Sequence, residues 1–332
     1  MNWDDVLEQY DLPRKAKMTA VGGTASPKVL VEASGQRYVL RQRPQAFARR
    51  ELTEYDHALR NYLADRHFPA PRVLPARSGF TWAEFNGHVY EMSCVLPGKI
   101  VPAPSAKLVF EAGQVLGRLH ELGRDFRHGG KENFVREDHI SILQPLLDEL
   151  KALAEQGEQK KQLGSLQKEL DDVTLQLEDA VYHSLEQSVI HGDFHPGNVL
   201  YTDSRITAVL DYDYASRQAI LRDIGDALMF FAATRRRPVD PDDIWSLTQG
   251  WLVDRERTLA FLKGYRCVRP LPAQWPYVSS LMLSRWIQCK LRGSRKVPVE
   301  QKVNFVLTDL WDPVHLLKRH YQAWLNLLIH TF

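Results

Sequence analysis

The sequence predicts an α+β protein in which a small antiparallel sheet precedes a mainly helical remainder. Before about residue 95, short runs of strand-forming residues alternate with tight-turn signals, as at 34–36 and 86–87, and this spacing is typical of hairpins. Later in the chain, apolar residues recur every three or four positions, which is the period of an amphipathic helix. A chain of 332 residues is long enough for two domains, which we place at residues 1–95 and 96–332.

The N-terminal part is predicted to contain a short helix, five strands and one longer helix. The short helix covers residues 3–10 and carries Val6, Leu7 and Tyr10 on one side. Strands are expected around the glycine pair Gly22-Gly23 and at 38–41, and further strands follow the longer helix. That helix is predicted over 48–64, and it ends before two closely spaced prolines at 69 and 71, because proline interrupts helical hydrogen bonding.

The remaining two thirds of the chain are predicted to be mainly helical. Residues 107–122 place a row of apolar side chains on one face, among which His120 is expected to be a buried structural residue. Two further helices are expected near 140–155 and 162–186, and another begins at about residue 220. The basic run at 235–237 is interpreted as the end of a helix, where positive charge favours the helix dipole.

Composition and charge exclude several classes of protein. The formal net charge is +2, with 44% hydrophobic and 25% charged residues, so no overall attraction to nucleic acid or to a membrane is expected. The three cysteines are scattered and form no metal-binding pair. The N-terminus lacks the features of a signal peptide, and no apolar run is long enough to span a membrane. We therefore expect a cytoplasmic protein, and the sequence leaves its oligomeric state open.

The most informative stretch is His-Gly-Asp-Phe-His-Pro-Gly-Asn at 191–198, followed by an apolar strand that ends in Asp211. Glycine and proline exclude a continuous helix, so Asp193 and Asn198 lie in a tight loop. Phosphoryl transfer assisted by Mg²⁺ requires a carboxylate beside the attacking hydroxyl and oxygen ligands for the metal. This pattern predicts a site in which one of the two carboxylates is the base, while the amide oxygen of Asn198 and the other carboxylate hold Mg²⁺.

Two other interpretations of this loop were considered. Asp and Asn beside Gly and Pro are common turn formers, although a second acid at the end of the next strand is then unexplained. A metallohydrolase site built on His191 and His195 is disfavoured, because the intervening glycine and the following proline prevent the two rings from sharing a helix face.

The stretch HGDFHPGNVL followed by AVLDYD resembles the aminoglycoside phosphotransferase and choline kinase family, protein-kinase-like enzymes that phosphorylate small molecules. The resemblance implies a bilobal protein-kinase-like fold, with a small antiparallel β-sheet lobe and a mainly helical lobe. It also implies ATP and Mg²⁺ as cofactors and a hydroxyl group as the acceptor. On the same ground, Asp193 is the expected catalytic base, and Asn198 and Asp211 are the expected Mg²⁺ ligands. A segment at 116–120 is similar to the LGxLH segment of the family, and Asp223 corresponds to an acid that ties a helix to the catalytic loop.

The resemblance also implies the residues that bind the nucleotide. Gly22 and Gly23 lie where the family has its nucleotide loop, and Arg41 stands where the family usually has a lysine, with Arg43 as the alternative contact. Glu54 is the predicted helix acid that pairs with this cation. The adenine ring is expected at the hinge that consists of Ser93, Cys94, Val95 and Leu96.

The acceptor is expected to contact the C-terminal helices, as it does in the family. Candidate contacts are taken from a segment that combines an aromatic ring, amides and cations, namely Trp286, Gln288, Lys290 and Arg292. Because this segment is basic, a polycationic aminoglycoside is disfavoured, and a sugar, a cyclitol, a hydroxy amino acid such as homoserine or an amino alcohol is favoured. The alternatives are a protein serine/threonine kinase of the same superfamily and a nucleotide-binding pseudokinase.

Overall fold

The chain forms two compact units, each of which combines segments that are distant in the sequence. The computed structural model describes residues 3–12, 16–21, 26–131, 135–155, 157–237, 239–240 and 243–329. The first unit comprises Met1–Ile100, Asp125–Glu132 and Asn198–Ala215, and the second comprises Val101–Arg124, Asn133–Gly197 and Ser216–Phe332. The first unit therefore extends past the expected boundary at residue 95 and includes two later segments.

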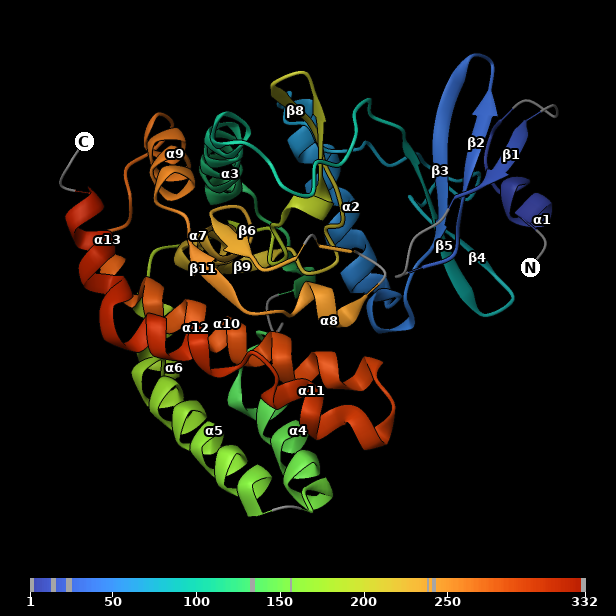
Figure 1. Cartoon of the computed structure of the whole chain (residues 1–332). Coiled ribbons are helices and arrows are strands. Elements are labelled where there is room, and N and C mark those ends of the chain that lie inside the picture. The colour runs from blue at the N-terminus through green and yellow to red at the C-terminus, as the bar shows by residue number, and fades with distance from the viewer. Residues whose placement is uncertain are drawn as a thin grey trace. The chain divides into compact units, whose positions relative to one another are not determined.

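A five-stranded antiparallel sheet forms the base of the first unit (Figure 1). Its strands are β1 (Lys17–Ala20), β2 (Lys28–Ala33), β3 (Gln36–Gln42), β4 (Ala83–Phe85) and β5 (His88–Cys94), in the order β1-β2-β3-β5-β4. Two-residue turns join β2 to β3 and β4 to β5, and all four turn residues have positive φ. Turns of this kind match the twist of a hairpin, as the sequence predicted.

One face of this sheet is covered by apolar side chains. Val31 of β2, Leu40 of β3 and Met92 of β5 are fully buried, and they belong to one cluster with Val6 of helix α1 (Trp3–Leu7) and with Tyr10. The hydroxyl of Tyr10 donates a hydrogen bond of 3.1 Å to the carbonyl of Tyr90. The unit also contains helix α2 (Arg50–Asp65) and the hairpin of β7 (Val199–Thr202) and β8 (Arg205–Val209).

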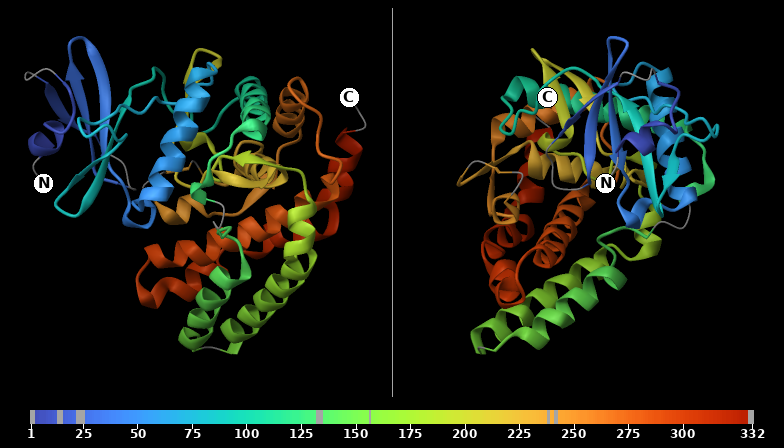
Figure 2. Two further views of the ribbon diagram at one scale, coloured as in Figure 1. Left: turned by 180° about the vertical axis from the view of Figure 1, so that it is seen from behind. Right: turned by 90° about the vertical axis from the view of Figure 1, so that its right-hand side faces the viewer.

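Long helices form most of the second unit. They are α3 (Ala106–Asp125), α4 (Ile140–Leu153), α5 (Gly157–Gln176), α9 (Arg255–Arg266) and α10 (Val278–Gly293). Helices α4 and α5 lie side by side as a hairpin (Figure 2), joined by a hydrogen bond between Gln144 and Gln167. The helix predicted over 162–186 is in fact two helices, because Glu178 adopts an extended backbone between α5 and α6 (Asp179–Ser184).

Helix α10 is buried along most of its length and contacts α4, α5 and α7 (Ile220–Phe230), so it is the central helix of the second unit. The shorter helices are α8 (Ile244–Leu247), α11 (Lys302–Leu307), α12 (Trp311–Leu316) and α13 (Gln322–Ile329). Within the described part of the chain, no helix is both long and apolar enough to cross a membrane.

Two small antiparallel ribbons complete the second unit. Strand β6 (Gln187–Ile190) pairs with β9 (Ser216–Ala219), and β10 (Ala233–Arg235) pairs with β11 (Trp251–Val253). The expectation that the basic run at 235–237 ends a helix is therefore wrong. Arg235 belongs to a strand and pairs in register with Trp251, so the helix dipole does not account for its position.

Candidate functional site

The loop that follows β6 is held at its start by a carboxylate from α7. The two oxygens of Asp223 accept the backbone N–H groups of His191 and Gly192 at 2.5 and 2.8 Å. Asp223 also lies 3.2 Å from Nε2 of the buried His120, whose Nδ1 faces the hydroxyl of Tyr265 at 2.8 Å. Gly192 has a φ of +78°, which side-chain-bearing residues adopt only with strain. Asp223 therefore fixes the geometry of the loop.

The carboxylate of Asp193 is held by two cationic or polar neighbours. Nη2 of Arg285 donates a hydrogen bond of 2.7 Å to Oδ1, and Nε2 of His195 lies 3.5 Å from Oδ2. Burial by itself would raise the pKa of Asp193, but the charges of His195, Arg285 and His191 outweigh it and hold that pKa far below its usual range. Asp193 is therefore ionised at neutral pH and can accept a hydrogen bond from a hydroxyl group.

Both histidines of the loop make hydrogen bonds within the loop itself. Nδ1 of His191 accepts the N–H of Asp193 at 3.3 Å, and Nδ1 of His195 accepts the N–H of Gly197 at 3.1 Å. An imidazole nitrogen that accepts a hydrogen bond carries no proton, so the proton of a neutral His195 lies on the nitrogen that faces Asp193. Both histidines therefore contribute to the structure of the loop.

Arg285 is fixed by further polar contacts on α10. Its Nη1 donates a hydrogen bond of 3.0 Å to Oε1 of Gln288, and its Nε lies 3.3 Å from Oδ1 of the buried Asp226. Burial raises the pKa of Asp226 to about 7, although the charges of Arg285 and Arg222 oppose this rise. Arg285 is thus held on three sides by Asp193, Asp226 and Gln288.

The predicted metal ligands lie in the first unit, on either side of the β7–β8 hairpin. Asn198 precedes β7, and its carbonyl accepts the N–H of Leu210 at 2.8 Å. Asp211 follows β8 with a φ of +63°, an uncommon conformation that tends to occur at functional positions. Its side chain is about one-third exposed, so solvent reaches it, and carboxylate and amide oxygens are suitable ligands for Mg²⁺.

Arg41 lies among three carboxylates of the same unit. Its guanidinium contacts Glu91 at 3.2 Å, Asp211 at 3.5 Å and Asp213 at 2.7 Å. Burial would lower the pKa of Arg41, but these three acids outweigh burial and raise it. Arg41 therefore stays charged beside the predicted metal ligand Asp211, where a guanidinium is suited to binding phosphate oxygens.

The acid on α2 that faces the strand cations is Asp56 and not Glu54. Arg43 forms ion pairs with Asp56 and with Glu91, and Nζ of Lys131 lies 2.5 Å from Asp56. Glu54 instead pairs with Arg50 on the exposed side of the helix at 2.9 Å. The expected pairing of Glu54 with Arg41 is therefore corrected, because Glu54 faces away from the sheet.

Of the other residues predicted to contact the nucleotide, the structure describes those of the hinge but not the glycine pair. Gly22 and Gly23 lie outside the described residues. Ser93 and Cys94 end β5, and the N–H groups of Cys94 and Val95 donate to the carbonyls of Arg72 and Arg37 at 2.9 and 3.0 Å. Contacts of Ser93, Cys94, Val95 and Leu96 with an adenine ring stay a prediction.

The side chains of the four acceptor candidates on α10 all make contacts within the protein. Nε1 of the buried Trp286 donates to the carbonyl of Leu310 at 3.0 Å, and Nζ of Lys290 donates to the carbonyl of Thr248 at 2.9 Å. Gln288 supports Arg285, and Arg292 pairs with Glu137. The side chain of this segment that lies beside Asp193 is Arg285, which was not among the four candidates.

Three cations of this segment, Arg285, Lys290 and Arg292, are paired or bonded to carbonyls, whereas Arg295 and Lys296 are exposed. The sequence offered one signal for Arg285, its place in the same basic stretch, but no local pattern links it to Asp193.

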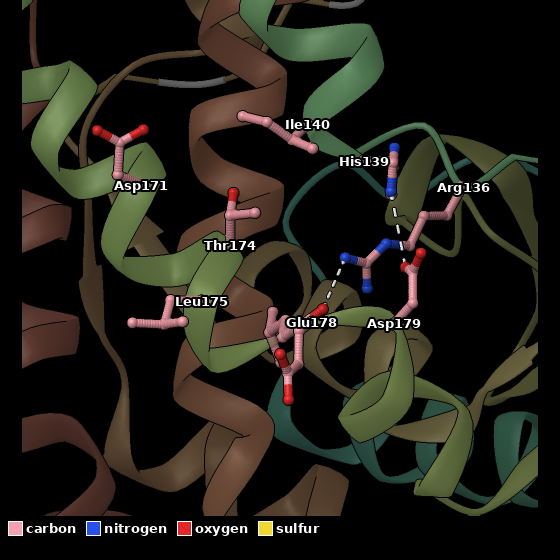
Figure 3. A pocket seen from close by; sticks show the side chains of 9 residues that line it. Arg136, His139, Ile140, Asp171, Thr174, Leu175, Glu178 and Asp179 are labelled. Carbon is pink, nitrogen blue, oxygen red and sulfur yellow. Dashed lines mark hydrogen bonds and ion pairs between the residues drawn. The ribbon is translucent and has the colours of Figure 1, made fainter.

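A separate hollow of the second unit lies where α4 begins and α5 ends (Figure 3). Arg136 donates to the carbonyl of Leu177 at 3.0 Å, and His139 lies 3.6 Å from Asp179. Asp171 and Glu178 add acidic side chains to its wall. None of the residues predicted for catalysis, for the nucleotide or for the acceptor lines this hollow.

Comparison with known proteins adds independent information on the family and the fold. Residues 17–265 match the phosphotransferase enzyme family. The homoserine kinase of Methylobacillus flagellatus is 27% identical over 279 residues, covering 81% of this chain and 77% of that protein. The homoserine kinase of Xanthobacter autotrophicus is 25% identical over 337 residues, covering 96% and 92%.

A solved structure gives the same result for the fold. An amicoumacin kinase, in complex with an ATP analogue, Ca²⁺ and amicoumacin, superposes with a TM-score of 0.68 at 15% sequence identity. The superposition covers 96% of this chain and 92% of that one. The predicted kinase-like α+β fold is therefore confirmed.

Proposed function

This chain belongs to the phosphotransferase enzyme family, and we propose that it transfers the γ-phosphoryl group of ATP to the hydroxyl of a small hydroxy amino acid of the homoserine type. That it is an ATP-dependent kinase with a hydroxyl acceptor follows from the family and from its similarity to homoserine kinases. The acceptor class rests on those relatives. The role of each residue rests on the geometry described above.

The observation that carries the mechanism is the environment of Asp193. An ionised carboxylate held by Arg285 and His195 can accept a hydrogen bond from the acceptor hydroxyl and orient its oxygen toward the γ-phosphorus. As the new bond between that oxygen and phosphorus forms, the bond from phosphorus to the bridging oxygen breaks and ADP leaves. The hydroxyl proton passes to Asp193.

The first unit supplies the groups that bind phosphate. Arg41, which stays charged among Glu91, Asp211 and Asp213, donates hydrogen bonds to phosphate oxygens in this proposal. Asn198 and Asp211 would hold Mg²⁺, which neutralises charge on the phosphates. Asp213 and Glu91 keep the guanidinium of Arg41 in place, so that it is preorganised for the nucleotide.

The test is release of ADP from ATP in the presence of Mg²⁺, with homoserine, serine, 3-amino-1-propanol, a sugar and a cyclitol as separate acceptors. We expect homoserine to stimulate turnover most. Asp193→Asn should reduce turnover about a hundredfold or more, because the amide cannot accept the proton. The matched control is Asp203→Asn, an exposed turn residue of the β7–β8 hairpin, which should retain full activity.

Two results would contradict the proposal. Equal activity of Asp193→Asn and the parent chain would exclude Asp193 as the base. Stimulation by a sugar, a cyclitol or 3-amino-1-propanol without stimulation by homoserine or serine would exclude the acceptor class while leaving the kinase activity in place.

A further inference from the structure

The ring of Phe230, the last residue of α7, packs against three side chains. Two of them contact Asp193, and the third is Arg235. The ring centroid of His195 lies 5.8 Å from that of Phe230. Cζ of Arg285 lies 6.0 Å from the centre of the Phe230 ring, and Cζ of Arg235 lies 5.5 Å from it. Because His195 and Arg285 both contact Asp193, the Phe230 ring connects the surroundings of Asp193 to Arg235.

Arg235 differs from the two arginines that follow it in its lack of an acidic partner. Arg236 pairs with Asp309 and Asp312, and Arg237 pairs with Asp243. Nη2 of Arg235 donates to the carbonyl of Met229 at 3.1 Å, while its buried Nε has no hydrogen-bond partner. Among the residues that the structure describes, no carboxylate lies within ion-pair distance of Arg235.

This lack of a partner is energetically unusual. A buried charge normally has an ionic partner, because its loss of hydration is otherwise uncompensated. Burial accordingly lowers the pKa of Arg235 to about 10, whereas the acids around Arg285 raise the pKa of that arginine. At neutral pH Arg235 is still a cation, so it is a partly buried positive charge, with a buried Nε, available to an anionic ligand.

The backbone holds Arg235 in a defined position. It is the last residue of β10, and it pairs with the buried Trp251 of β11. A side chain that projects from a paired strand is better preorganised than one on a loop. The contact with the Phe230 ring limits the guanidinium further, since a planar cation packs favourably against an aromatic face.

We propose that Arg235 binds the carboxylate of the acceptor and thereby selects hydroxy acids over the corresponding amino alcohols. This inference rests on the proposed function, which places the acceptor hydroxyl at Asp193. A guanidinium matches a carboxylate with two parallel hydrogen bonds. Arg285 is not suited to this task, because its nitrogens are engaged by Asp193, Asp226 and Gln288.

An anion at Arg235 could also come from the nucleotide, because phosphate oxygens bind guanidinium groups equally well. The two sources predict different kinetic effects. A role in binding the acceptor changes the KM for the acceptor alone, whereas a role in binding phosphate changes the KM for ATP with every acceptor.

The experiment compares homoserine with 3-amino-1-propanol, which lacks only the carboxylate. The parent chain should use homoserine with a kcat/KM about 10- to 100-fold higher, as expected for a charge-assisted hydrogen-bonded pair. Arg235→Gln should remove that preference through a higher KM for homoserine, with the KM for ATP and the rate with 3-amino-1-propanol unchanged. Arg235→Lys should recover part of the preference, and the exposed Arg237→Gln serves as the matched control.

Several outcomes would overturn the inference. They are equal use of both acceptors by the parent chain, an equal loss with both acceptors in Arg235→Gln, and a raised KM for ATP in that variant. The comparison of the two acceptors in the parent chain needs no variant, so it can overturn the inference even if Arg235→Gln does not fold. If neither homoserine nor 3-amino-1-propanol stimulated ADP release, the proposed acceptor class would be refuted, and with it the premise of this inference.

Discussion

Arg285 on α10 donates a hydrogen bond of 2.7 Å from Nη2 to Oδ1 of Asp193, across 92 positions of the sequence. The same guanidinium contacts Asp226 at 3.3 Å and Gln288 at 3.0 Å. The carboxylate of Asp193, the proposed base, is therefore held by a cation that is itself held by a second carboxylate. The position and the ionisation of Asp193 both depend on this arrangement.

Removal of Arg285 should change the pH dependence of catalysis. Arg285 helps to keep the pKa of Asp193 below its usual range, so Arg285→Ala should raise that pKa and shift the acidic limb of kcat/KM to higher pH. The value of kcat should also fall about 10- to 100-fold, in proportion to the lost charge-assisted hydrogen bond. The measurement is a pH–rate profile, with the exposed Arg295→Ala as control; an unchanged acidic limb would restrict Arg285 to a structural role.

Asp226 should make the folded chain less stable as the pH rises. Burial raises the pKa of Asp226 to about 7, compared with about 3.9 for an unperturbed aspartate. Between about pH 4 and pH 7, Asp226 is protonated in the folded chain but ionised in the unfolded chain. The stability that this proton contributes is therefore complete below about pH 4 and is lost as the pH rises through about 7. Asn cannot ionise and avoids this loss.

Asp226→Asn should therefore raise the melting temperature, relative to the parent chain, more at pH 8 than at pH 5. Thermal unfolding of both chains at the two pH values measures this difference. Asp203→Asn, on the exposed β7–β8 turn, should show the same melting temperature as the parent at both. A benefit of Asp226→Asn that is larger at pH 5 would contradict the assigned direction of the pKa shift.

Local sequence patterns can propose only those parts of the candidate site that depend on local structure. Asp193, Asn198 and Asp211 were proposed because a single loop and the strand after it carry all three, and their roles stay predictions. Arg285 was missed because its partner is distant in the sequence. Glu54 was chosen in place of Asp56, and a two-residue error on a helix of about 3.6 residues per turn moves a side chain to nearly the opposite face.

The same distinction applies to the fold. The hairpins of the sheet were predicted because their turns have specific residue requirements, as at Asn86 and Gly87. The strand at 233–235 was not predicted, because a three-residue ribbon is determined by its pairing with β11 and not by its own pattern. The break between α5 and α6 was also missed, since Leu177 and Val181 continue the helical period across it.

The two strand arginines of the first unit should have separable roles. Arg43 is buried between Asp56 and Glu91, so Arg43→Met leaves both acids with less compensation and should cost about 3–5 kcal/mol of stability. Arg41→Lys keeps a charge but loses the forked geometry. It should raise the KM for ATP with a small effect on the melting temperature.

Chemical denaturation and steady-state kinetics of both variants test this assignment. The KM for the acceptor should be unchanged in Arg41→Lys, which serves as an internal control. If Arg43→Met raised the KM for ATP without a loss of stability, Arg43 would be the phosphate contact and Arg41 the structural residue.

Asp223 should be required for the shape of the catalytic loop. Its oxygens accept two consecutive backbone N–H groups and lie beside His120, and each hydrogen bond to a charged group contributes about 1.5–3 kcal/mol. Asp223→Ala should therefore destabilise the fold by about 2–5 kcal/mol and lower kcat, because Asp193 follows these two residues directly. Asp223→Asn retains one acceptor oxygen and should lie between the parent and the alanine variant. Hydrogen exchange at the amides of His191 and Gly192, together with kcat, measures the effect; full protection and full activity in Asp223→Ala would show that β6 alone positions the loop.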